Sequence, residues 1–244
     1  MVERCLCKAE VRGSSPLAST VLLLVWEWLT SAMQIEVWAD VVCPWCFIGK
    51  RRLQHALAER GLTDQVEVVH RAFQLDPTAS TTPEPTVDRL AGKYGVGRDE
   101  ALAMMANVTE VAAGEGLDYH LDRTMSGNTL DAHRLVLWAQ EQDEAAALRL
   151  LEVLYSAYFE QGRSVFGTDD LAGLAEEAGL DPEGARRVLA TSAYADQVEQ
   201  DQELAHAFGA GGVPFFVIDR AYGVSGAQPV EVFLSALDQA SASA

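Results

Sequence analysis

The fold of this chain is decided by IEVWADVVCPWCF, residues 35–47. The apolar run at 35–40 predicts a short β-strand, and the segment from Pro44 to about residue 60 is predicted to be a helix. Proline suits the first helical position, because its missing N–H would be unpaired there and its φ is already helical. The Cys-Pro-Trp-Cys quartet therefore falls at a strand-to-helix turn, the local arrangement that dithiol–disulfide chemistry uses.

The two cysteines of the quartet are predicted to have different roles. Cys43 lies where the free N–H groups and the positive dipole end of a helix favour a thiolate, which is the form of cysteine that attacks disulfides. Cys46 comes one helical turn later on the same face, where it can resolve a mixed disulfide. We therefore predict Cys43 and Cys46 to be the catalytic residues.

A zinc site is the structural alternative for a cysteine pair at this spacing. Two such cysteines would supply half of the ligands, and a second Cys/His pair would have to supply the rest. The five histidines offer no paired spacing of that kind: His55, His70, His120, His133 and His206. We therefore expect no metal and assign the pair to redox chemistry.

Composition limits the classes of partner. The chain has 244 residues, of which 49% are hydrophobic, so it can bury a proper core. Its 36 acidic and 18 basic residues give a net charge of −18, which argues against nucleic acid and anionic membranes as partners. Four cysteines are too few for a disulfide scaffold in a chain of this length.

Residues 1–32 fit poorly with the rest of the chain. The apolar run at 21–29 is shorter than a membrane span of about 20 residues and contains Glu27. Either Met33 is the functional start, which we prefer, or 1–32 is the signal segment of an exported precursor. We treat 1–32 as an extra segment outside the fold and expect a cytoplasmic protein, with export as the alternative.

The remaining elements complete a recognisable order. The alternating run at 66–73 predicts a second strand, parallel to the first. Residues 86–208 are predicted to be helical almost throughout, and the tail is predicted to contain strands at 213–219 and 222–226 and a last helix. We therefore predict an α/β thioredoxin fold (β-α-β … β-β-α) with a large all-helical insertion. The predicted parts are a thioredoxin-fold domain at 33–85 and 209–244 and an inserted helical domain at 86–208.

Motifs along the chain carry a family resemblance. They are DVVCPWC at 40–46, FQLDP at 73–77, NTLDAHR at 128–134, and GVPFF at 212–216 with VSGA at 224–227. In this order they resemble the FrnE-like branch of the DsbA family of thiol–disulfide oxidoreductases, from Met33 to near the C-terminus.

The resemblance implies roles for particular residues. In such proteins the first cysteine of the pair is the nucleophile and the second resolves, which agrees with Cys43 and Cys46. The proline before the third strand is cis and faces the cysteine pair, a role that falls on Pro214. The backbone of Val213 would then be exposed to pair with an extended substrate. We predict Pro44, Trp45, Val213 and Pro214 to be the substrate-binding residues.

Two departures from the family's pattern bear on the chemistry. Trp45, inside the quartet, offers no charged or titratable group to the thiols. Some relatives carry a further cysteine pair near the C-terminus, whereas this chain has no cysteine after Cys46.

The predicted function is exchange of dithiol and disulfide with protein or peptide substrates. The redox-active Cys43–Cys46 disulfide needs no bound cofactor, although glutathione can be a co-substrate, and a thioredoxin-type protein or glutathione can recycle the pair. In a reducing cytoplasm a reductase or isomerase role is favoured over a net oxidase.

Two other functions stay open. One is a glutathione-dependent enzyme similar to 2-hydroxychromene-2-carboxylate isomerase or kappa-class glutathione transferase. Those enzymes usually have serine at the position of Cys43 and lack the second cysteine. The other is a non-enzymatic binding or chaperone-like module, for which the cysteine pair would be unnecessary.

Three polar residues have structural interpretations. Asp40 is either a turn acceptor or a group that tunes the thiols. His133 and His206 are interpreted as hydrogen-bonded structural histidines on helices. A proton relay through either would require a proximity to Cys43 that sequence does not give.

Overall fold

The computed structural model describes residues 33–243, and it begins with a strand–helix–strand unit. Strand β1 (Met33–Ala39) leads through the quartet into helix α2 (Pro44–Glu59), and β2 (Val66–Ala72) comes next. The two strands pair in parallel, with Met33 opposite Val66 and Ala39 opposite Ala72. The predicted β-α-β unit is confirmed, whereas both interpretations of residues 1–32 lie outside the described residues.

The C-terminal elements complete the sheet. Strands β5 (Phe215–Ile218) and β6 (Tyr222–Ser225) form an antiparallel hairpin, and α10 (Val230–Ser243) ends the described chain. Because β5 is also antiparallel to β1, the strand order is β2-β1-β5-β6. The predicted strand from residue 213 begins too early, since the Val213–Pro214 bond is cis and the ladder starts at Phe215.

The segment between β2 and β5 is mainly helical. It adds two features that the sequence did not predict, a two-stranded ladder of β3 (Glu84–Pro85) and β4 (Met125–Ser126) and the π-helical turn η2 (Ser156–Glu160). Its helices are α3 (Thr86–Tyr94), α4 (Arg98–Gly114), the 3₁₀ turn η1 (Leu121–Arg123), α5 (Leu130–Gln142), α6 (Glu144–Tyr155), α7 (Thr168–Glu177), α8 (Pro182–Leu189) and α9 (Ala195–Ala207).

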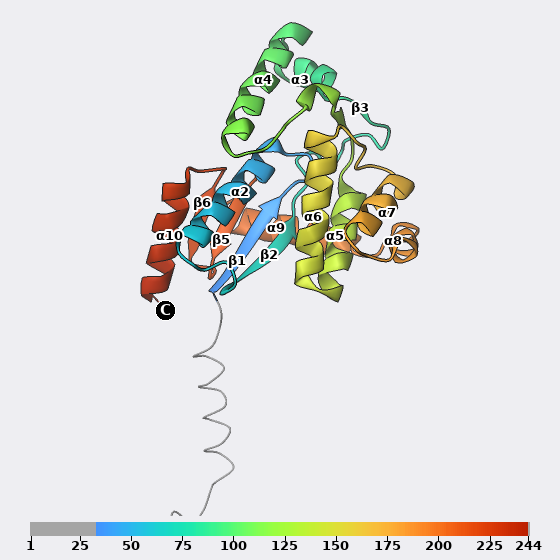
Figure 1. Cartoon of the computed structure of the whole chain (residues 1–244). Helices are drawn as coiled ribbons and strands as arrows, with labels where there is room; N and C mark the ends of the chain where they lie inside the picture. Colours follow the sequence, from blue (N-terminus) through green and yellow to red (C-terminus); the bar gives the residue numbers. More distant parts are fainter. Residues whose placement is uncertain (1–32, 244) are drawn as a thin grey trace, which may run out of the picture. The chain divides into compact units, whose positions relative to one another are not determined.

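Both faces of the sheet are covered (Figure 1). Helices α2 and α10 lie side by side on one face, where Ile35, Phe216 and Phe233 form part of an apolar cluster. Helix α9 covers the other face, where Trp38 and Phe215 belong to a second cluster. Successive strand residues point to opposite faces, which explains how neighbouring residues enter different clusters. Trp38 and Phe216 are almost completely buried in these clusters.

The helical segment packs directly on the quartet end of α2. The ring of Phe47 stacks on Tyr155 with centroids 5.0 Å apart, and Arg52 forms an ion pair of 2.6 Å with Glu115. Residues 33–244 cluster as one compact unit. The division into a thioredoxin-fold part and a helical part stays a prediction. Within 33–243, no helix combines the length and apolarity needed to cross a membrane.

Candidate redox site

The quartet forms a tight turn at the end of β1. The Cys43 N–H donates to the carbonyl of Asp40 (3.1 Å), and the Cys46 N–H donates to the carbonyl of Cys43 (3.0 Å). Pro44 is the first helical residue, as predicted, and Cys43 is the residue at the helix N-cap. Both cysteines are free thiols and are buried, with exposed fractions of 4% and 2%.

The chain brings Val213 and Pro214 beside Cys43. The Sγ of Cys43 lies 3.6 Å from the carbonyl oxygen of Val213, and the Val213–Pro214 bond is cis. Helix α2 approaches this segment closely at Gly49, where an added Cβ would lie 3.0 Å from Cγ of Pro214 and 3.1 Å from Phe216. A side chain at this position would therefore require Pro214 or Phe216 to move by a few tenths of an ångström.

Cys46 is held as a neutral thiol. Burial raises the pKa of Cys46 well above its ordinary value, and the neighbouring Cys43 and the Asp40 carboxylate raise it further. A proton must therefore be removed from Cys46 when it acts as a nucleophile. The chemistry of the turn depends on which group receives that proton.

Asp40 supports both of its interpretations. Its carboxylate accepts the N–H of Leu75 (2.8 Å) and that of Val42 (3.5 Å), so it is a turn acceptor. Its charge also raises the pKa of Cys46. In addition, Nε2 of His133 lies 3.3 Å from Oδ1 of Asp40, close enough for an ion pair but outside hydrogen-bond geometry.

The prediction that His133 is hydrogen-bonded is wrong. Among the described residues, neither of its ring nitrogens has a hydrogen-bond partner. Sequence could not show this, because Asp40 and His133 are far apart along the chain. His206 lies exposed on α9, with its ring against the edge of Phe73 at 5.8 Å.

A hollow of about 980 Å³ opens beside Cys43, between the quartet and the α3–α4 helices. Of the six large apolar side chains that are exposed in the described part of the chain, the following four line it: Trp45, Leu75, Tyr94 and Met104. Pro44 and Val213 also line the hollow. Of the predicted substrate-binding residues, only Pro214 is not part of its lining.

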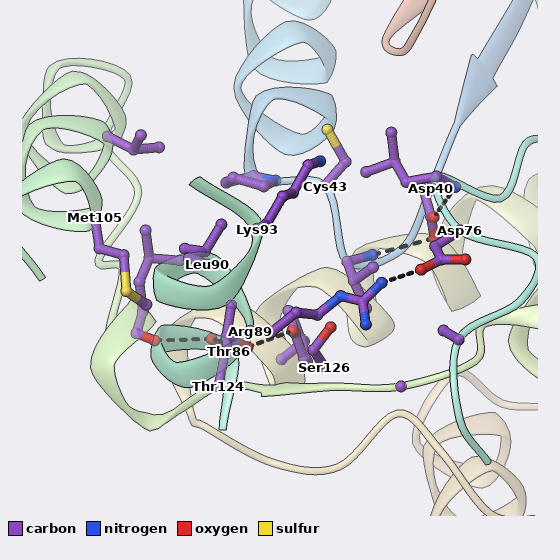
Figure 2. A pocket seen from close by; sticks show the side chains of 18 of the residues that line it. Asp40, Cys43, Asp76, Thr86, Arg89, Leu90, Lys93, Met105, Thr124 and Ser126 are labelled. Atoms are coloured by element: carbon purple, nitrogen blue, oxygen red, sulfur yellow. Dashed lines mark hydrogen bonds and ion pairs between the residues drawn. The ribbon is translucent and has the colours of Figure 1, made fainter. Parts of the chain in front are cut away.

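The polar part of the hollow was not predicted. Figure 2 shows Arg89 of α3 reaching Asp76 of the FQLDP motif, with which it forms an ion pair, and Lys93 and Cys43 extending into the same hollow. Arg89 also lies 3.6 Å from Glu84. The sequence gives no local signal for such a cavity, because its lining comes from the quartet, α3, α4 and other segments that are far apart along the chain.

No metal centre is evident in the part of the chain that the structure describes. Within 33–243, no group of three or more His, Cys, Asp or Glu residues is arranged to hold an ion.

The four-stranded sheet, its helical insertion and the quartet beside a cis proline define a class of thioredoxin-fold proteins. The chain belongs to the DSBA-like thioredoxin domain family, whose model matches residues 34–238. It is similar to the probable DsbA oxidoreductase SCO1869 from Streptomyces coelicolor, with 46% identity, a TM-score of 0.82 and coverage of 87% of this chain and 91% of that one.

Two more distant proteins match over nearly their whole length. The uncharacterized protein YwbO of Bacillus subtilis is 26% identical over 209 residues, which is 84% of this chain and 96% of YwbO. The cytosolic disulfide reductase DsbM from Pseudomonas aeruginosa is 18% identical with a TM-score of 0.61, over 86% of this chain and 100% of DsbM. At that identity, the likeness to DsbM shows the fold alone.

Proposed function

We propose that this protein is a thiol–disulfide oxidoreductase of the FrnE-like branch, in which Cys43 attacks and Cys46 resolves. The observation that carries the proposal is the position of Cys43 Sγ, 3.6 Å from the carbonyl of Val213 and at the edge of the hollow. A sulfur in this position has a substrate-sized space on one side and a backbone segment for docking on the other.

The exchange proceeds in two steps. The Cys43 thiolate attacks one sulfur of a substrate disulfide, forming a mixed disulfide and releasing the first substrate thiolate. Cys46 then loses its proton and attacks Cys43 Sγ, which releases the second substrate thiolate and leaves the Cys43–Cys46 disulfide. The reverse sequence oxidises a substrate dithiol, and the direction depends on the potential of the recycling partner.

The substrates proposed are proteins or peptides. An extended segment can pair with the backbone of Val213 as an added strand. Alternate residues of that segment would point to the same side as the attacked cysteine. They would contact Trp45 and Leu75, whose side chains are 39% and 51% exposed in the free protein.

The compartment and recycling system are also proposals. We place the protein in the cytoplasm, with export as the alternative, and propose glutathione or a thioredoxin-type protein as the partner that returns the pair to its starting state. The net charge of −18 supports partners other than nucleic acid or anionic membranes.

Turnover of a disulfide-bonded peptide in a glutathione buffer tests the function. The full chain should catalyse exchange, Cys43→Ser should be inactive, and Cys46→Ser should accumulate the mixed disulfide. Absence of catalysis by the full chain would move the glutathione-dependent isomerase or transferase to first place. If Cys43→Ser replaced the wild-type protein in the cell without loss of function, the non-enzymatic binding module would be favoured.

A further inference from the structure

Helix α3 presents a row of polar side chains to the hollow beside Cys43. Thr86, Arg89 and Lys93 all line the hollow. They are three and four positions apart, the spacing that places side chains on one face of a helix. Figure 2 shows Lys93 extending from α3 into the hollow into which Cys43 also points. A substrate disulfide bound at Cys43 would therefore meet this face of α3.

The first two residues of the row are tied to internal partners. Arg89 forms ion pairs with Asp76 and Glu84, the second at 3.6 Å. The hydroxyl of Thr86 accepts a hydrogen bond of 3.0 Å from Thr124. A substrate that bound Arg89 would have to compete with carboxylates that the folded chain already supplies.

Lys93 is the member of the row without such a partner. Its side chain is exposed, and within residues 33–243 its ammonium has neither an ion-pair nor a hydrogen-bond partner. The ammonium lies 5.7 Å from the ring centre of Tyr94, a cation–π contact that is weak at an exposed site. Its three N–H donors are therefore available to an acceptor from outside the chain.

The charge of Lys93 is not matched from within the hollow. The four carboxylates of the lining already have partners inside the chain: Asp76 and Glu84 with Arg89, Asp88 with Arg98, and Asp40 with the N–H of Leu75. A substrate can therefore neutralise Lys93 without breaking an internal pair. An anionic group is attracted to this position, whereas a cationic group is repelled.

The size of the hollow limits how far that anionic group lies from the attacked sulfur. A hollow of about 980 Å³ is on the order of 10 Å across, a distance that an extended peptide covers in about three residues. Protein and peptide segments supply carboxylates of this kind as Asp and Glu side chains. The acceptor for Lys93 would then be an acidic side chain close in sequence to the attacked cysteine.

We propose that Lys93 is a specificity-determining residue, which binds a carboxylate that the substrate carries within about three residues of the attacked cysteine. The preferred substrates are then disulfides in acidic protein or peptide segments. The inference rests on the proposed function, because that function places the substrate in the hollow beside Cys43.

The net charge of the chain acts against acidic substrates only at long range. A charge of −18 repels them, but at about 0.15 M salt the repulsion between exposed charges is screened beyond about 8 Å. A contact inside the hollow is shorter than this distance and keeps more of its strength. The preference should therefore be measured at physiological salt.

Lys93 also has a structural role that the test must separate from substrate binding. It lies in the last turn of α3, where a positive charge stabilises a helix through its dipole. That role does not depend on what the substrate carries. A rate that depends on the charge of the substrate therefore reports binding by Lys93 and not the stability of α3.

A single-turnover experiment with peptides of different charge tests the inference. The reduced full chain is mixed with the symmetric disulfide dimer of a single-cysteine peptide that has Asp, Asn or Lys two residues from the cysteine. Oxidation of Cys43 and Cys46 is followed by acid quenching and mass spectrometry, without glutathione. We compare wild type, Lys93→Gln and Lys93→Arg. The matched control is Arg187→Gln, which removes a charge that is 71% exposed on α8, outside the hollow.

The expected result is a preference that depends on both charges. The Asp peptide should oxidise wild type about 3- to 10-fold faster than the Asn peptide, a range between that of an exposed ion pair and that of a buried charged hydrogen bond. The Lys peptide should be the slowest. Lys93→Gln should react equally with the Asp and Asn peptides, whereas Lys93→Arg and Arg187→Gln should keep the wild-type preference.

A crosslink locates the contact directly. In Cys46→Ser the peptide stays attached to Cys43, and a carbodiimide then joins amines to carboxylates that touch them. The chain has only three lysines, Lys8, Lys50 and Lys93, and Lys50 is paired with Glu152. We expect an amide between Lys93 and the Asp of the peptide, and none with the Asn peptide.

Other results would overturn the inference. It fails alone if wild type reacts equally with the Asp and Asn peptides, or if the preference survives in Lys93→Gln. It also fails if only oxidised glutathione, and not the Asp peptide, loses reactivity in Lys93→Gln. If no peptide oxidises wild type, the proposed function fails and the inference with it. Should Lys93→Gln not fold, the crosslink to Lys93 decides, and its absence overturns the inference.

Discussion

The hydroxyl of Tyr119 donates a hydrogen bond of 2.8 Å to the carbonyl oxygen of Pro44. Tyr119 lies after α4 in the helical segment, whereas Pro44 is the first residue of α2, so this bond fastens the insertion to the quartet. The ring of Tyr119 also stacks on Phe159 at 4.8 Å and on Phe47 at 6.2 Å. The contact is therefore part of what fixes the hollow beside Cys43.

Two substitutions separate the hydrogen bond from the packing. Tyr119→Phe keeps the ring and should lower the free energy of unfolding by about 1 kcal/mol. Tyr119→Ala also loses the stacked ring and should cost about 3–5 kcal/mol. Burial raises the pKa of Tyr119, and the nearby thiols raise it further, so its hydroxyl stays protonated between pH 6 and pH 9. The difference in free energy of unfolding between Tyr119→Phe and wild type, measured by urea unfolding, should therefore be the same across this range. Equal losses of free energy of unfolding in Tyr119→Phe and Tyr119→Ala would contradict a separate contribution from the stacked ring.

The close approach of α2 to the cis-proline segment predicts a second effect. A Cβ in Gly49→Ala would lie 3.0 Å from Cγ of Pro214, and such overpacking typically costs about 1–3 kcal/mol. Because Pro214 adjoins the carbonyl beside Cys43, peptide turnover should fall as well. The matched control is Gly173→Ala on α7, where an added Cβ meets nothing within 4 Å; it should gain about 0.5–1 kcal/mol and keep wild-type turnover. If Gly49→Ala had the free energy of unfolding and the peptide turnover of wild type, the close contact between Gly49 and Pro214 would be contradicted.

The exposed apolar lining of the hollow predicts a substrate effect. Leu75→Ala keeps the backbone N–H that Asp40 accepts but removes apolar surface that a peptide would cover. For a peptide with a leucine two residues from its cysteine, KM should rise about 5- to 10-fold with kcat unchanged. Val232→Ala removes a comparably exposed side chain from α10, outside the hollow, and should leave both constants unchanged. A fall in kcat without a change in KM would argue against a docking role for Leu75.

The sequence predicted the elements better than the site they form. Apolar alternation and the helix-starting Pro44 are local patterns, and each leads into the expected strand or helix. The cis bond at Pro214 came from the family resemblance, because no local pattern specifies it. Its prediction is confirmed.

The interactions around the thiols could not be predicted in the same way. The approach of His133 to Asp40 joins α5 to the end of β1, and it exists only because the helical segment packs across the quartet. The hollow likewise depends on the position of α3. Periodicity indicates which face of a helix is buried, but not which residue of a distant element it meets.

We expect Glu144, at the start of α6, to make the protein less stable as pH rises. Burial and the nearby carboxylate of Glu67 raise the pKa of Glu144 to about 7, from an ordinary value of 4.5. Between these two values the folded chain binds more protons than the unfolded chain, so the free energy of unfolding falls as pH rises through this range. This contribution is present below about pH 4.5 and lost above about pH 7.

Removing the charge should therefore stabilise the protein only at higher pH. Glu144→Gln should raise the free energy of unfolding by about 1 kcal/mol at pH 8, allowing for partial exposure, and change it little at pH 4. Glu67→Gln should have a similar effect. Each single variant removes the same Glu144–Glu67 repulsion, so the double variant should gain less free energy of unfolding than the sum of the two single gains. Glu203→Gln on the exposed side of α9 controls for net charge. Equal stabilisation by Glu203→Gln at pH 8, measured by urea unfolding, would show that overall charge and not the Glu144–Glu67 contact is responsible.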